Sequence, residues 1–308
     1  MNVLVTGGAG FIGSHLIRSL LDRGDRVTVL DSFDDAYDPA IKIANIEGLE
    51  ITLIEGDVRD RSAVEEAMRG VDAVVHLAAL AGVRESLINP AEYASVNIGG
   101  TVTLLEALRA RPSIPFVFAS SSSVYGDRST GPFLEDDPLG FPASPYAGSK
   151  RAAELMCNAA HLSWAQSVTI LRFFTVYGPR QRPTMAISKF IRMAQSGETI
   201  PVFGNGSTQR DYTYVDDVVA AVQVALDTPQ AFTVFNVGGG SPIRLDALVA
   251  AVGEATDTDI QTEMLDEQPG DVVLTWADSS RIQEKLGWAA KVDIAEGLRR
   301  TVAALGEG

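Results

Sequence analysis

The chain has 308 residues, of which 46% are hydrophobic and 21% charged, as is ordinary for a globular protein of one large or two modest domains. Lys and Arg total 25 against 40 Asp and Glu, so the formal net charge is −15. This charge argues against a nucleic-acid partner, because binding to phosphate backbones needs a basic surface. No apolar run reaches the roughly 18 residues of a membrane-spanning helix, and no signal-peptide pattern precedes the first strand.

The single cysteine, Cys157, cannot form an internal disulfide, which fits a reducing compartment. We therefore expect a cytoplasmic protein with no membrane partner. An apolar helical setting predicts that this thiol is buried and inert.

Short apolar runs alternate with helical patterns through the first half of the chain. The predicted strands cover 2–6, 26–30, 49–54, 73–77, 115–119 and 168–172, and the predicted helices cover 14–23, 60–70, 91–109 and 145–165. This alternation, with nearly continuous Val, Ile and Leu in the strands, predicts an α/β fold with a Rossmann-like, doubly wound parallel sheet covered on both faces.

The regular alternation ends near Gly178, where prolines and glycines begin to interrupt the chain. Shorter elements follow at 187–196, 216–226, 234–237 and 245–256. We expect one domain over 1–178 and a smaller C-terminal α/β lobe over 179–308, with later segments returning to the first domain.

A glycine-rich turn joins the first predicted strand to the first predicted helix. Gly7, Gly10 and Gly13 allow a tight turn, close approach of the backbone to a pyrophosphate and close packing of helix on strand. Phe11 and Ile12 lie in this turn beside the predicted cofactor, and the N–H groups at the start of the following helix favour phosphate. A purely structural turn is the alternative, but this position favours a dinucleotide site.

Acidic residues follow the second and third predicted strands. Asp31 lies 18 residues after Gly13, where a carboxylate binds the adenosine ribose hydroxyls and repels a 2′-phosphate. The alternative is an aspartate that only closes a turn. Asp57 follows the third strand and could hold the adenine amine. The sequence therefore predicts NAD as the cofactor rather than NADP.

Tyr146 and Lys150 are four residues apart, so their side chains share one face of a helix. An ammonium group and the nicotinamide ring both favour phenolate, which would lower the pKa of Tyr146 and let it take a proton from a substrate hydroxyl. This pair alone is often structural. The serines at 120–123 add a second signal, because they follow a strand whose carboxyl end faces the ligand crevice.

These motifs resemble the extended short-chain dehydrogenase/reductase superfamily, in its NAD-dependent sugar-nucleotide epimerase/dehydratase branch. The resemblance covers nearly the whole chain and rests on Gly7-x-x-Gly10-x-x-Gly13, Asp57, His76-Leu77-Ala78-Ala79, Ser121 with Tyr146 and Lys150, the segment 172–178, and the segment 210–217.

The resemblance implies a role for each matching residue. It makes Ser121 the hydrogen-bond partner of the sugar O4, Tyr146 the acid/base, and Lys150 the ligand of the nicotinamide ribose. It implies that NAD stays tightly bound and is regenerated in each turnover. It also places Val58, Leu77, Ala78 and Ala79 beside the cofactor. We predict no metal site, because the three histidines lack ligand spacing.

The reaction is narrowed by the two residues after Ser121. The related 4,6-dehydratases and glucuronate decarboxylases carry a carboxylate there, whereas this chain has Ser122 and Ser123. This favours simple 4-epimerisation, in which hydride leaves C4, the 4-ketose rotates and hydride returns to the other face.

Three segments, at 34–42, 81–90 and 181–185, resemble UDP-glucuronate 4-epimerases. The last contains Arg182, which with Thr175 could bind the substrate carboxylate, and the second contains Arg84 and Ser86. The alternative for Arg182 is a surface arginine or a phosphate ligand.

The nucleotide half is implied by resemblance alone. It assigns Arg210 to the diphosphate and Asp271 to the uridine ribose. Related galactose epimerases often carry an arginine two or three positions before this aspartate, where this chain has Gln268, and Arg84 could supply that charge instead. The alternative for Arg210 is a salt bridge to a neighbouring aspartate.

The predicted function is therefore 4-epimerisation of a UDP-sugar, from UDP-glucuronate to UDP-galacturonate. The first alternative is a UDP-glucose/UDP-galactose 4-epimerase. A dehydratase or decarboxylase, or an NAD-binding sensor without catalysis, ranks lower. The helices at 91–109 and 145–165 carry more apolar surface than one sheet face needs, and the resemblance implies a homodimer joined by a four-helix bundle.

Overall fold

The computed structural model describes residues 1–266 and 271–306. Its centre is a seven-stranded sheet in the order β11-β6-β5-β4-β1-β2-β3, with every neighbouring pair parallel. The strands are β1 (Asn2–Thr6), β2 (Arg26–Asp31), β3 (Thr52–Glu55), β4 (Ala73–His76), β5 (Phe116–Ser121), β6 (Val168–Phe173) and β11 (Phe232–Val237). The predicted Rossmann-like sheet is confirmed.

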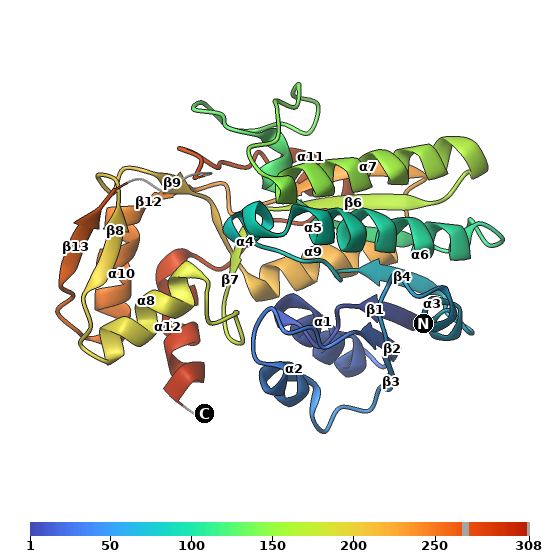
Figure 1. Ribbon diagram of the computed structural model, residues 1–308, viewed down its shortest axis with the longest axis horizontal. Helices are drawn as coiled ribbons and strands as arrows, with labels where there is room; N and C mark the ends of the chain where they lie inside the picture. Colours follow the sequence, from blue (N-terminus) through green and yellow to red (C-terminus); the bar gives the residue numbers. More distant parts are fainter. Residues whose placement is uncertain (267–270, 307–308) are drawn as a thin grey trace.

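Helices cover both faces of this sheet (Figure 1). Successive residues of a strand point to opposite faces, so Val3 and Val5 join the core beneath one helical layer while Leu4 joins the other. The first layer contains α1 (Phe11–Asp22) and α9 (Val215–Asp227), and the second contains α3 (Arg61–Ala67), α6 (Gly100–Leu108) and α7 (Pro145–Trp164). This double burial explains the nearly continuous apolar residues of the strands.

The helix predicted over 91–109 is interrupted. It consists of α5 (Pro90–Ala94), a π-helical turn η1 (Ser95–Gly99) and α6. In the first half of the chain, the short helices α2 (Pro39–Ile46) and α4 (Val83–Ile88) were not expected. Each is eight residues or shorter, too short to show a clear helical period in the sequence.

Two elements from the second half of the chain return to the large sheet. Strand β11 pairs with β6, with Val234 beside Ile170, and helix α9 packs on α1.

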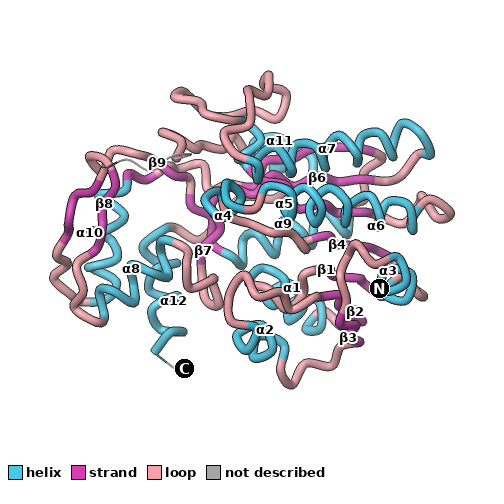
Figure 2. Tube along the Cα trace, viewed as in Figure 1, coloured by secondary structure: helices cyan, strands magenta, loops and turns pink. Residues whose placement is uncertain are grey.

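The remaining elements form the smaller lobe, which Figure 2 shows at one end of the molecule. Its small sheets pair β8 (Ile200–Phe203) with β13 (Thr262–Leu265), β9 (Gln209–Arg210) with β12 (Ile243–Arg244), and β7 (Thr175–Tyr177) with β10 (Tyr212–Tyr214). Its helices are α8 (Ala186–Gln195), α10 (Leu245–Thr256) and α12 (Ile294–Gly306), and α11 (Ser280–Leu286) packs near β11.

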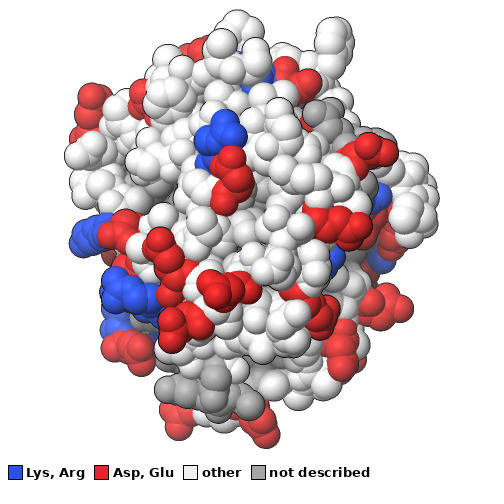
Figure 3. All heavy atoms as spheres, turned by 90° about the vertical axis from the view of Figure 1, so that its left-hand side faces the viewer, with Lys and Arg blue, Asp and Glu red and all other residues white. Residues whose placement is uncertain are grey.

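Acidic side chains are spread over the face of the molecule that this lobe forms, and basic ones gather at a few places (Figure 3). This pattern agrees with the net charge of −15. Within the described residues, no helix is long and apolar enough to span a membrane.

Candidate active site

A cavity of about 790 Å³ opens at the carboxyl ends of the large sheet's strands, next to the smaller lobe. Every residue predicted to bind the cofactor lines it, and so does every predicted substrate residue except Arg84 and Ser86. Ligands of open α/β sheets bind at this edge, so one cavity can hold cofactor and substrate together.

The turn between β1 and α1 is shaped by its glycines. Gly7 has a φ of +69°, and a Cβ there would lie 2.7 Å from the backbone nitrogen of Ala78. A Cβ on Gly13 would lie 2.3 Å from the carbonyl oxygen of Gly7. Helix α1 begins at Gly10 with no side-chain cap and no acidic residue in its first turn. Its free N–H groups and positive dipole end therefore suit a pyrophosphate.

Asp31 ends β2 at the cavity wall and is held by the backbone. One carboxylate oxygen accepts from the N–H of Ala9 at 2.9 Å, and the other accepts from Phe33 at 3.0 Å. Burial raises the pKa of Asp31, and these two bonds lower it. Each oxygen keeps a second lone pair, so the carboxylate can still accept from ribose hydroxyls.

Asp57 lies on the same wall but is paired. Its carboxylate accepts from the guanidinium of Arg59, with a shortest distance of 2.6 Å, and this hydrogen bonding lowers the pKa of Asp57. Arg59 also bonds Glu92, at 2.8 Å. The predicted contact of Asp57 with adenine therefore has to be shared with Arg59, which lines the cavity and which the sequence reasoning missed.

Tyr146 and Lys150 lie one turn apart at the start of α7. The helix starts here because the Ser144 hydroxyl accepts from the N–H of Ala147 at 3.2 Å and Pro145 occupies the first turn. The predicted catalytic pair is thus fixed to a rigid element by its own capping sequence.

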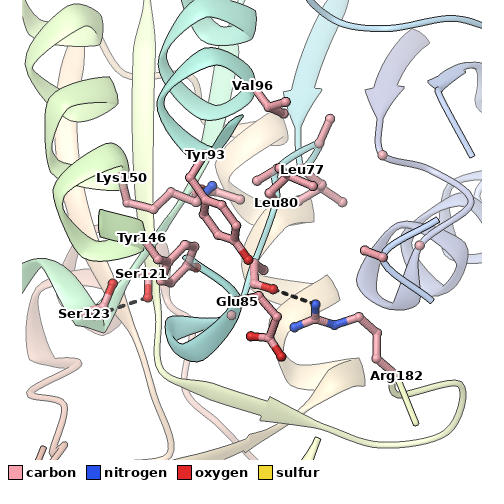
Figure 4. Close-up of a pocket in the computed structure, with 18 of the residues that line it drawn as sticks. Leu77, Leu80, Glu85, Tyr93, Val96, Ser121, Ser123, Tyr146, Lys150 and Arg182 are labelled. Carbon is pink, nitrogen blue, oxygen red and sulfur yellow. Dashed lines mark hydrogen bonds between the residues drawn. The ribbon is translucent and has the colours of Figure 1, made fainter. Parts of the chain in front are cut away.

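The Tyr146 phenol faces Ser121, at the end of β5 (Figure 4). Burial raises the pKa of Tyr146, while a hydrogen bond with Ser121 and the charge of Arg182 lower it. Lys150 was expected to lower this pKa, but its ammonium donates to the carbonyl of Ala119 at 2.9 Å. Burial lowers the pKa of Lys150 to about 8. In this geometry, Arg182 is the cation that favours the phenolate.

The serines after Ser121 form a 3-10 turn, η2 (Ser122–Tyr125), whose first residues line the cavity. The Ser121 hydroxyl accepts from the N–H of Ser123 at 3.1 Å. The Ser123 hydroxyl is buried and has no hydrogen-bond partner among the described residues. A buried unpaired hydroxyl costs free energy, so it is a candidate contact for a polar substrate group.

Two arginines in the cavity have no acidic partner in the described part of the chain. Arg182 follows β7 and donates to the carbonyl of Ala81 at 2.8 Å. Arg210 ends β9, donates to the carbonyl of Gln209 at 2.9 Å, and has its pKa lowered by burial. Cations without ion pairs inside a cavity favour anionic ligands.

The neighbouring aspartates do not pair with Arg210, contrary to the alternative considered from sequence. Asp211 is fully buried and accepts from the N–H groups of Gly239, Gly240 and Ala277 at 2.8–3.0 Å. Asp216 lies near His15 and Arg300 instead. Arg210 therefore remains available to an anion.

The family of this protein is identified by a sequence match that covers most of the chain. Residues 3–238 match the NAD dependent epimerase/dehydratase family. The chain belongs to this family.

Relatives within the epimerase/dehydratase family include UDP-glucuronate 4-epimerase of Thermodesulfobacterium geofontis strain OPF15. It is 37% identical over 306 residues, which cover 97% of this chain and 94% of that protein. The crystal structure of UDP-glucuronic acid 4-epimerase from Bacillus cereus, in complex with UDP-glucuronic acid and NAD, is 33% identical and has a TM-score of 0.93. The match covers 100% of this chain and 99% of that chain.

The fold alone does not separate the reactions of this family. DesIV, a dTDP-glucose 4,6-dehydratase from Streptomyces venezuelae, is 32% identical, also has a TM-score of 0.93, and is matched over 100% of this chain and 98% of its own. The reaction must therefore be argued from the site residues.

Not all predicted substrate residues of this epimerase/dehydratase chain reach the cavity. Ser86 is fully buried, and its hydroxyl donates to the carbonyl of Val83 within α4 at 2.6 Å. In this structure Ser86 therefore does not line the cavity, and its predicted contact with the substrate stays a prediction. Arg84 lies outside the cavity wall, over the ring of Phe203, and its guanidinium is 3.7 Å from the carboxylate of Asp271.

Arg84, which could supply the missing charge near the diphosphate, and Asp271, assigned to the uridine ribose by resemblance, are therefore neighbours. Gln268, which stands where related galactose epimerases often carry an arginine, lies outside the described residues.

The sequence reasoning also missed cavity residues near Arg182. Tyr37 and Lys42 belong to one group, in which the buried Lys42 ammonium donates to Asp34 at 2.6 Å and lies over the ring of Tyr37. Glu85 and Tyr93 belong to another, beside the catalytic tyrosine (Figure 4). Resemblance marked the segments that contain three of these residues but gave no reason to single them out.

The histidines lie in structural positions. His76 is buried between the hydroxyls of Thr6 and Thr101, at 2.7 and 3.0 Å, and burial lowers its pKa to about 3. Among residues 1–266 and 271–306, no cluster of three or more His, Cys, Asp and Glu side chains could hold a metal ion.

Proposed function

We propose that this protein is an NAD-dependent 4-epimerase that interconverts UDP-glucuronate and UDP-galacturonate. The observation that carries this proposal is Arg182, which lies across the cavity from Tyr146 and has no acidic partner among the described residues (Figure 4). A carboxylate on C5 of the sugar would satisfy this cation with a charge-assisted hydrogen bond. The named relatives described above support the same substrate.

The residues of the β1–α1 turn fit NAD. The glycine cradle and the uncapped start of α1 would take the pyrophosphate, and Asp31 would take the adenosine ribose and repel a 2′-phosphate. Bound NAD supplies the acceptor and donor of the C4 hydride and is regenerated in each turnover.

Three residues would handle the proton at O4. Ser121 donates a hydrogen bond to O4, and the Tyr146 phenol takes and returns its proton. Lys150, one turn further along α7, would bind the nicotinamide ribose, while Arg182 and the nicotinamide ring would favour the phenolate. Ser122 and Ser123 cannot supply the carboxylate that elimination requires, so the ketose would keep its substituents.

The remaining polar groups would hold the rest of the sugar nucleotide. Thr175 and the unpartnered hydroxyl of Ser123 lie on the cavity wall with Arg182 and would share the carboxylate. Arg210 would bind the diphosphate, and Asp271 would accept from the uridine ribose. Residues 1–178 would thus bind mainly NAD, and 179–308 mainly the sugar nucleotide.

We also propose that the protein is a cytoplasmic homodimer. Leu155, Met156 and Leu162 project from α7 with exposed fractions of 61%, 40% and 78%. Packing of α7 and of the α5–α6 segment against a second copy would bury them in a four-helix bundle. The free, buried Cys157 is compatible with a reducing compartment.

The test is to incubate the purified protein, without added NAD, with UDP-glucuronate and separately with UDP-glucose, and to identify products by anomeric proton NMR. We expect UDP-galacturonate from the first and little galactose nucleotide from the second. Arg182→Ala should reduce uronate conversion at least a hundredfold and neutral-sugar conversion far less. Efficient conversion of UDP-glucose alone would instead assign a UDP-glucose/UDP-galactose 4-epimerase.

A further inference from the structure

We propose that Glu85 is an internal counter-ion for Arg182 and sets the selectivity of the sugar pocket between a uronate and a neutral hexose. The proposal rests on the proposed function, because it assumes that the substrate carboxylate meets Arg182. It states that the same pocket can bind a negatively charged uronate and a neutral hexose. It also states that Glu85 shifts the relative affinity toward the neutral sugar.

Glu85 and Arg182 meet at one turn of the chain. Gly82 has a φ of +134°, and a Cβ there would lie 2.2 Å from the Glu85 carboxylate, which is therefore folded over this glycine. The Arg182 guanidinium donates to the carbonyl of Ala81, the preceding residue, at 2.8 Å. Figure 4 shows both groups facing the same part of the cavity. The two charged groups thus lie against successive residues of one turn, although no ion pair joins them among the described residues.

Glu85 differs from most other acids of the cavity in being unengaged. Asp34 is paired with Lys42, Asp57 and Glu92 with Arg59, and Asp271 with Arg84, while Asp31 is held by backbone N–H groups. In the described part of the chain, no hydrogen bond or ion pair involves the Glu85 carboxylate. Its side chain is exposed and can move.

Both charges act on the same phenol. Burial, followed by the Glu85 carboxylate, raises the pKa of Tyr93 to about 12, while Arg182 opposes this shift. The ring of Tyr93 packs edge-on against Tyr146, with centroids 6.3 Å apart. The Glu85–Arg182 pair therefore borders the catalytic tyrosine rather than a remote surface.

The consequence follows from charge balance. A neutral hexose brings no anion to Arg182, and a cation left without compensation in an enclosed site costs free energy. Glu85 supplies that compensation. A uronate brings its own carboxylate, which Glu85 repels until it turns toward solvent. Glu85 should therefore strengthen binding of the neutral sugar and weaken binding of the uronate.

The experiment measures binding with chemistry blocked. In NAD-loaded Tyr146→Phe protein, calorimetry gives Kd for UDP-glucuronate and UDP-glucose with and without Glu85→Gln. We expect Glu85→Gln to strengthen the binding of UDP-glucuronate and to weaken the binding of UDP-glucose. The ratio of the two Kd values should therefore shift about tenfold, or 1.4 kcal/mol. Glu65→Gln, which removes an exposed charge on α3 away from the cavity, should leave the ratio unchanged.

The counter-ion role also predicts dependence on Arg182. In an Arg182→Gln background, Glu85→Gln should no longer favour the uronate through this pair, and the ratio shift should fall at least threefold. An equal change in both Kd values, no change, or a shift that persists without Arg182 would overturn the proposal. If the wild-type protein converts no UDP-glucuronate, the proposed function fails, whereas the two Kd values still report on Glu85.

Discussion

Lys150 illustrates how a single residue can serve catalysis at a cost in stability. Its ammonium is buried and meets a backbone carbonyl rather than a carboxylate, and burial lowers its pKa to about 8. Lys150→Met should abolish turnover but raise the Tm of protein stripped of NAD at pH 7. The substitution removes the free-energy cost of burying the Lys150 ammonium. This cost is at most about 3 kcal/mol, because the pKa of Lys150 is lowered by roughly two units. Thermal melts and the NMR assay measure the two effects.

The pH dependence gives the sign of this effect. The unfolded chain keeps the Lys150 proton to above pH ~10, whereas the native protein loses it near pH 8, so native stability rises with pH between these values. The gain in the free energy of unfolding that Lys150→Met gives over the wild type should be largest below pH 8 and should decrease above it. Lys189→Met, at an exposed position on α8, is the control and should show neither effect. A variant less stable than wild type at pH 7 would contradict the argument.

At this same scale, the sequence predicts residues whose placement depends on local spacing. Tyr146 and Lys150 share a face because they are four apart on a helix, and Gly7 lies at a turn that only glycine allows. The burial of Ser86 was not predictable, because the direction of its hydroxyl depends on α4, a helix too short to be predicted. The pairing of Arg84 with Asp271 joins positions 187 residues apart, and no local pattern indicates it.

Among the elements, the π-helical turn η1 connects the cavity wall to α7. Asn97 within it accepts from the N–H of Leu80 at 2.8 Å and donates to the Leu80 carbonyl at 3.0 Å and to the Ser149 hydroxyl at 2.9 Å. Leu80 lines the cavity, and Ser149 precedes Lys150. The turn thus places the side-chain amide of Asn97 between the cavity wall at Leu80 and helix α7. Such π-helical turns are frequent at functional sites.

We expect Asn97→Ala to destabilise the protein by about 2 kcal/mol, because it leaves the partly buried backbone groups of Leu80 without these partners. NAD retention should also fall, since Leu80 would lose its anchor. Chemical denaturation and the NAD content of the purified protein measure these effects. Asn158→Ala, on the half-buried side of α7, is the matched control. Unchanged stability in Asn97→Ala would show that these three bonds contribute nothing net.

Length helped the prediction of some elements, but the 13-residue helix α12 was missed despite its amphipathic pattern. The run at 145–165 repeats apolar residues at helical spacing over five turns, and it forms α7 (Pro145–Trp164). The helix expected over 91–109 also has helical spacing, but the π turn is set by the bonds of Asn97 to another part of the chain. Such long-range hydrogen bonds override local propensity.

For the whole molecule, the topology explains why one cavity can join two lobes. Strand β11 and helix α9 return to the sheet after the chain has built part of the smaller lobe, so the two lobes are connected by several crossings rather than one linker. Arg182 and Arg210 reach the cavity from segments on these crossings. A mainly acidic protein thereby gathers the few cations that an anionic substrate needs at one place.

The exposed face of α7 carries the last prediction, which concerns assembly. Leu155 and Leu162 are seven residues apart, so they project from one side of the helix, and both are more than half exposed. If α7 forms the proposed interface, Leu155→Asp combined with Leu162→Asp places four buried carboxylates in each dimer. Light scattering after gel filtration should then give the mass of one chain, against twice that mass for the wild type.

The control variant must distinguish disruption of the proposed α7 interface from the general effect of replacing an exposed apolar residue with aspartate. Met264→Asp changes an equally exposed residue on β13, in the other lobe, and should remain dimeric. Because Leu155 and Leu162 face away from the core while Cys157 and Ala160 face into it, the double variant should keep its helical circular dichroism. A wild type that is monomeric at micromolar concentration, or a double variant that still dimerises, would place any interface elsewhere on the molecule.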